Sequence, residues 1–67
     1  MNEPATLHEA VDLAVALRLA EEKQRERGRR MELITTRQAR VGARESFLRA
    51  GVLRERRLAL LRRWHIL

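Results

Sequence analysis

The sequence predicts an all-α protein in which two long helices pack as a helical hairpin. Eleven leucines and nine alanines make up most of the 30 apolar residues, and arginine and glutamate supply most of the charge. All four residue types favour helices, whereas β-branched and aromatic residues are few. With 67 residues and no cysteine, residues 1–67 form a single small domain that needs tight helix packing or association for stability.

The first helix is expected from about residue 6 to residue 40. It opens with the segment TLHE, in which Thr6 would be the N-cap and Glu9 would reach back in a capping box. One broad apolar face follows at helical spacing: Leu7, Ala10, Val11, Leu13, Ala14, Leu17 and Ala20. The charged run EEKQRERGRR (21–30) is expected to continue the helix as a solvated stretch, because only Gly28 interrupts it.

The segment MELITTRQARV (31–41) has two interpretations. Its apolar residues fit a helical spacing, whereas Met31, Leu33 and Thr35 also alternate as in a strand. A lone strand needs a partner strand and the chain offers no second candidate, so the helix is favoured. Gly42 is the expected turn, because glycine readily adopts the left-handed conformation that ends a helix.

A second helix is expected from about residue 43 to residue 66, unless Gly51 breaks it. On a helical wheel its apolar residues form three stripes separated by arginines. The first, the Trp64 stripe, holds Leu53, Leu60, Trp64 and Leu67; the second holds Phe47, Leu58 and Leu61; the third, the Leu48 stripe, holds Leu48, Val52, Ala59 and Ile66. One hairpin covers only one side of this helix, so the surplus apolar surface predicts self-association or a larger assembly. Three stripes also argue against a membrane-surface helix, which needs a single apolar face.

The Trp64 stripe is the predicted partner-binding site. Tryptophan is the residue type most enriched at the energetic centres of interfaces, which makes Trp64 the expected anchor. Arg57 and Arg63 flank the stripe and are expected to form a polar rim that pairs with carboxylates of the partner.

Positive charge is concentrated in the C-terminal two thirds of the chain, which makes nucleic acid the alternative partner. Residues 1–22 hold five acidic residues and one arginine, whereas residues 23–67 hold fourteen basic residues and four glutamates. The candidate phosphate contacts are Arg25, Arg27, Arg29, Arg30, Arg56, Arg57, Arg62 and Arg63. Aromatic residues that stack on unpaired bases are almost absent, and a solvated basic surface explains the same arginines.

Residues suited to catalysis or metal binding are few. The chain has no cysteine or tyrosine, Ser46 is its only serine, and His8 and His65 are 57 positions apart. His8 and Asp12 are more simply explained as a surface pair, one helical turn apart, than as half of a metal site. We therefore expect a non-enzymatic interaction, adaptor or assembly subunit with no metal, cofactor or small-molecule substrate.

The sequence gives no indication of a membrane partner. No stretch approaches the ~20 apolar residues of a membrane-spanning helix, and the start of the chain is acidic, unlike a secretory signal. A cytoplasmic location is therefore expected.

Overall fold

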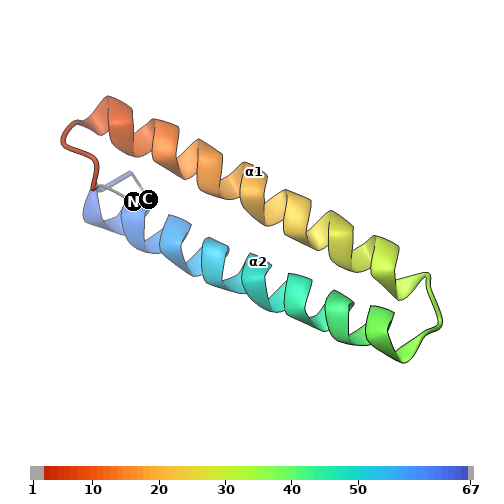
Figure 1. The fold of residues 1–67 in the computed structure, drawn as a ribbon. Coiled ribbons are helices and arrows are strands. Elements are labelled where there is room, and N and C mark those ends of the chain that lie inside the picture. The colour runs from red at the N-terminus through yellow and green to blue at the C-terminus, as the bar shows by residue number, and fades with distance from the viewer. Residues whose placement is uncertain (1–2, 67) are drawn as a thin grey trace.

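The computed structural model describes residues 3–66, which form two α-helices joined by a short connection (Figure 1). Helix α1 spans Leu7–Glu32 and helix α2 spans Arg37–Arg63. The helices run antiparallel, so the start of α1 lies beside the end of α2, at what we call the open end. The described residues measure 45 × 20 × 14 Å and contain no strand. The predicted all-α helical hairpin is confirmed.

Helix α1 begins at the predicted cap. The Thr6 hydroxyl accepts a hydrogen bond from the backbone N–H of Glu9 at 3.2 Å. The Glu9 carboxylate reaches back to the backbone N–H of Ala5 at 3.0 Å, one residue before the N-cap. Both bonds satisfy donors that a helix start leaves without partners.

The turn predicted at Gly42 is wrong in position: the connection comprises residues 33–36, and Gly42 lies inside α2. Three of these four residues are β-branched, a type that loses side-chain freedom in a helix. The Thr36 hydroxyl then accepts a hydrogen bond from the backbone N–H of Ala39 at 3.2 Å and caps α2. The first helix therefore ends at Glu32 rather than near residue 40, and the second begins at residue 37 rather than 43.

None of the three glycines ends a helix. Gly28 is buried in α1 beneath Phe47, where an added Cβ would lie 2.8 Å from the Cζ atom of the ring. Gly42 lies beneath the side chain of Met31, which occupies the space of the missing Cβ. Gly51 faces open space within an uninterrupted α2. Two of the glycines therefore make room for side chains of the opposite helix.

The helices meet along a seam of small side chains. Buried positions recur four, three or seven residues apart, a spacing that keeps one stripe facing a single neighbouring helix. They are Ala10, Ala14, Leu17, Glu21 and Gly28 on α1, and Ala39, Ala43, Ser46 and Ala50 on α2. Within residues 3–66, Leu17 is the only large apolar residue that is buried, at 5% exposed. The hairpin therefore has a narrow core.

Helix α2 ends in a Schellman motif. His65 has φ of 54°, in the left-handed region, and its backbone N–H donates to the carbonyl of Arg62 at 3.1 Å. The N–H of Ile66 donates to the carbonyl of Leu61 at 2.9 Å. These bonds satisfy two of the carbonyls at the end of the helix.

Candidate protein-binding surface

A buried ion pair joins the two helices near their middle. The Glu21 carboxylate is only 1% exposed and accepts a hydrogen bond from Arg57 Nε on α2 at 3.2 Å. Its other oxygen lies 2.6 Å from Arg25 Nη2, one turn further along α1. Arg57, which was expected to face a partner's carboxylate, thus pairs within its own chain.

The burial of Glu21 corrects the prediction that residues 21–30 form a solvated stretch. Glu21 lies four residues after Leu17 and seven after Ala14, both of which are buried in the seam. Continuing this spacing through the charged run identifies Glu21 and Gly28 as seam positions. The spacing therefore indicated that Glu21 and Gly28 are buried, although a charged residue and a glycine are not typical of a helix core.

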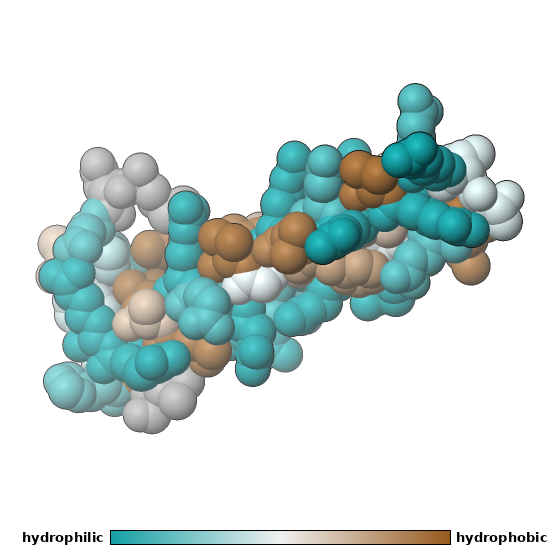
Figure 2. All heavy atoms as spheres, turned by 90° about the horizontal axis from the view of Figure 1, so that it is seen from below, coloured by the Kyte–Doolittle hydropathy of each residue, from teal (hydrophilic) through white to brown (hydrophobic). Residues whose placement is uncertain are grey.

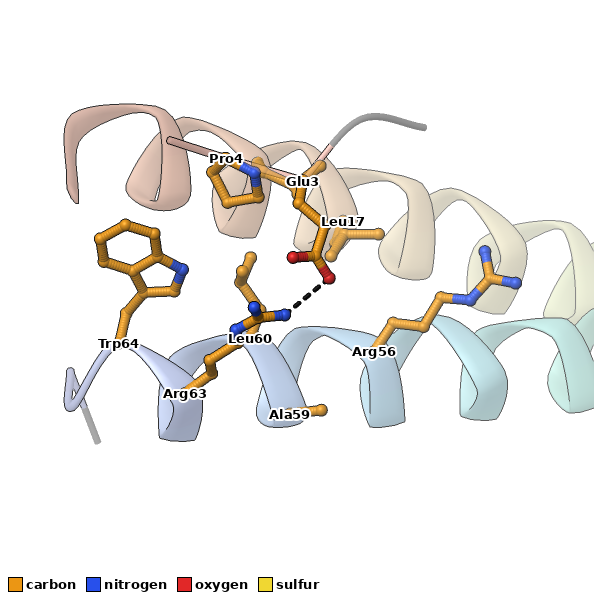
Figure 3. Close-up of a pocket in the computed structure, with 9 residues that line it drawn as sticks. Glu3, Pro4, Leu17, Arg56, Ala59, Leu60, Arg63 and Trp64 are labelled. Atoms are coloured by element: carbon orange, nitrogen blue, oxygen red, sulfur yellow. Dashed lines mark hydrogen bonds and ion pairs between the residues drawn. The ribbon is translucent and has the colours of Figure 1, made fainter. Parts of the chain in front are cut away.

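The structure brings Leu60 and Trp64 together at the open end, where both are half-buried (Figure 3). They line a cavity of about 280 Å³ with Glu3, Pro4, Leu13, Leu17, Arg56, Ala59 and Arg63. Arg63 Nη1 pairs with Glu3 Oε1 at 2.6 Å, so this arginine also binds a carboxylate of its own chain rather than one of a partner. Trp64 and Leu60 thus face α1 and the segment that precedes it.

The rest of the Trp64 stripe lies elsewhere. Leu53 is half-buried near the middle of the hairpin, where it lines a second hollow with Gln24. Leu67 lies outside the described residues. Binding of a partner by the Trp64 stripe stays a prediction.

The Leu48 stripe is an apolar line along α2 that the fold leaves uncovered. Leu48, Val52, Ala59 and Ile66 are all exposed, and Val41 continues the line by two turns. The four of these positions that lie in α2, Val41, Leu48, Val52 and Ala59, fall within about 40° of one another around the helix, and Ile66 follows the helix end. Figure 2 views the hairpin from the α2 side and shows apolar groups surrounded by polar side chains.

The two basic clusters lie at opposite ends of the hairpin because the helices are antiparallel. Residues 25–30 lie next to the connection and residues 54–63 next to the open end of the rod, which is 45 Å long. Four of the eight candidate phosphate contacts form ion pairs within the chain: Arg25, Arg30, Arg57 and Arg63. Arg27, Arg29, Arg56 and Arg62 are exposed. The predicted contacts therefore do not form one surface.

Charge differs sharply between the helices. Helix α1 carries six acidic and six basic residues, and Arg18, Arg25 and Arg30 each pair with a glutamate of the same helix. Helix α2 carries nine arginines against two glutamates, a surplus of seven positive charges. Within residues 3–66, only Arg57 and Arg63 of these nine lie within ion-pair distance of a carboxylate. The uncompensated charge therefore belongs to α2.

The polar residues considered for catalysis or metal binding are not gathered in one place. His8 Nε2 lies 3.4 Å from Asp12 Oδ2 on the exposed face of α1. Ser46 is fully buried in the seam, where a substrate cannot reach its hydroxyl. In the part of the chain that the structure describes, no three histidine, aspartate or glutamate side chains are placed to hold a metal ion.

Neither described helix is long and apolar enough to cross a bilayer. No protein-family model matches the chain, and no curated protein or solved structure matches it either. The function is therefore inferred from the surface of the hairpin.

Proposed function

We propose that the protein is a non-enzymatic interaction subunit that packs its helices against other protein chains. The contrast between the inner seam and the outer surface supports this proposal. The seam holds mainly alanine, glycine and serine, whereas ten large apolar side chains of the described residues are 42–84% exposed. Contiguous exposed apolar surface typically marks an interaction site.

Association with a partner would also add stability, which a chain of this size has little of on its own. A domain of about 60 residues buries only about 60% of the surface of its unfolded chain and is marginally stable alone. A partner that binds only the folded state stabilises it by mass action. The half-buried Leu60 and Trp64 at the open end remain candidates to anchor such a partner, with Leu53 and Leu67 of the same stripe.

Size-exclusion chromatography with light scattering tests the proposal. The tagged protein is purified from its source cells, treated with nuclease and run in ~0.5 M salt, which weakens phosphate contacts far more than apolar packing. We expect a protein assembly with a mass well above the 7.9 kDa of one chain. A particle with the mass of one tagged chain and no associated protein would contradict the proposal.

Nucleic-acid binding is the second candidate, and the seven surplus positive charges of α2 favour it. Binding through phosphates would fall steeply with salt. Changing Arg62 and Arg63 together to Gln should then abolish binding, whereas Trp64→Ala should leave it intact. The protein-packing proposal predicts the reverse order, because an anchoring tryptophan contributes more than exposed ion pairs of about 0–1 kcal/mol each.

A further inference from the structure

We infer that the Leu48 stripe of α2 binds an acidic amphipathic helix of a partner protein. This inference rests on the proposed function and specifies the face and the chemistry of its partner. Three features of the hairpin support it: the shape of the stripe, the charges beside the stripe, and the ion pairs that α1 already forms within itself.

The shape of the stripe suits a helix. With Val41 included, its members are spaced seven, four, seven and seven residues apart, a pattern that repeats every two helical turns. Within α2 the line runs from Val41 to Ala59, about 27 Å, which is roughly two thirds of the length of the helix. Leu48 and Val52, at 62% and 54% exposed, are the large side chains at its centre.

The charges beside the stripe specify an acidic partner. Glu55 and Glu45 lie one on each flank, where they are outnumbered by six arginines: Arg37, Arg44 and Arg62 beside Glu55, and Arg49, Arg56 and Arg63 beside Glu45. All six are exposed, and of these only Arg63 forms an ion pair within residues 3–66. Positions that flank a helix–helix seam select partners by charge, so glutamates and aspartates are expected opposite these arginines.

A second copy of this chain fits the stripe poorly. Two α2 helices laid together would bring nine arginines against nine, and like charges in an interface repel. Helix α1 of a second copy also exposes apolar residues and could in principle face the stripe. Its carboxylates Asp12 and Glu22, however, are already paired with His8 and Arg18 rather than with arginines of α2.

Lipid and nucleic acid also fit less well than a helix. A helix that lies on a bilayer needs a wide apolar face, whereas this stripe is narrow. A phosphate backbone would contact the arginines and leave Leu48 and Val52 without an apolar partner. A helix with apolar residues along one line and carboxylates on both sides would cover the apolar line and pair with the surplus arginines beside it.

Three synthetic helices of 27 residues, the length of α2, test the inference. The first has leucine and valine along one seam with glutamates beside it. The second has the same seam with lysines, and the third has the glutamates with serine along the seam. Fluorescence anisotropy with the full-length protein at ~0.15 M salt should give at least tenfold tighter binding for the first helix than for the others. Equal binding of the lysine helix or the serine helix would overturn the inference.

Paired variants locate the binding surface. Leu48→Ser with Val52→Ser should weaken binding of the first helix by at least tenfold, because two buried apolar contacts are lost. Val15→Ser with Leu19→Ser is the matched control on α1, since these side chains are 53% and 54% exposed, and binding should be unchanged. Circular dichroism checks that both variants remain folded. An equal loss in the control would show that the stripe is not the site.

Charge reversal and two other ligands complete the test. Arg49→Glu with Arg56→Glu should shift preference from the glutamate helix to the lysine helix. Tighter binding of a 20-base-pair DNA duplex, or of phosphatidylserine–phosphatidylcholine vesicles, than of the glutamate helix would assign α2 to that ligand instead. If partner proteins still co-purify with the Leu48 and Val52 double variant, the proposed function stands and the inferred surface is wrong.

Discussion

The buried pair between Glu21 and Arg57 predicts an asymmetry among three variants. Arg57→Met leaves a carboxylate that is 1% exposed, with Arg25 as its one remaining ion-pair partner in the described part of the chain. Breaking a buried ion pair costs about 3–5 kcal/mol. Arg25 is itself 40% exposed and still neutralises part of the charge, so the expected loss lies near the lower limit, about 3 kcal/mol.

The second single variant should lose less stability than Arg57→Met, and the double variant should lose none. Glu21→Leu leaves Arg57, whose side chain is 22% exposed and can turn its guanidinium towards water, so a smaller loss of about 1–2 kcal/mol is expected. Replacing both members with apolar residues removes both desolvation costs, and such replacements are often neutral or stabilising by about 1–4 kcal/mol. The double variant should therefore be at least as stable as the original protein.

Urea unfolding followed by circular dichroism, at one fixed protein concentration, measures these differences. A domain of this length is stable by roughly 3–10 kcal/mol, so Arg57→Met should unfold at a much lower urea concentration or be partly unfolded without urea. Arg54→Met, which changes an exposed arginine of the same helix, is the control and should shift stability by less than ~0.5 kcal/mol. A double variant whose loss equals the sum of the two single losses would refute this account of the pair.

The remaining predictions concern the glycines and the end of α2, and the same urea assay measures each. Gly51→Ala should stabilise the hairpin by about 1 kcal/mol, because the residue is helical and faces open space. Gly28→Ala should not give this gain in the original protein, because its Cβ meets the ring of Phe47, but should give it in a Phe47→Ala background. An equal gain from Gly28→Ala in both backgrounds would mean that the ring moves aside freely. His65→Gly should stabilise by roughly 1 kcal/mol, because glycine adopts the left-handed conformation at this position without strain, and a loss of stability would contradict that reasoning.

Composition and spacing determined the fold class and the first helix start. Leucine, alanine, arginine and glutamate favour helices wherever they occur, and Thr6 with Glu9 marked a helix start that depends only on neighbouring residues. The connection at residues 33–36 was also marked locally, by a β-branched run and by Thr36 as a cap. The predicted turn lies at the wrong position because Gly42 resembles a turn residue. In the structure, Gly42 instead makes room for the side chain of Met31 on the opposite helix.

The tertiary structure alone decided which faces are inside. Helix α2 has three apolar stripes, but the line of residues that is buried against α1 belongs to none of them. The antiparallel pairing turned Ala39, Ala43, Ser46 and Ala50 inward, because small residues let the helices approach closely, and it left Leu48 and Val52 outside.

The same pairing decided which charges are satisfied. Glu21 and Arg57 are 36 residues apart, so no local pattern links them, yet they form the one ion pair between α1 and α2 in the described chain. The arginines of α2 face outward without such partners because α2 holds only two glutamates. Burial and charge pairing depend on contacts between distant residues, and these contacts exist only once the hairpin has closed.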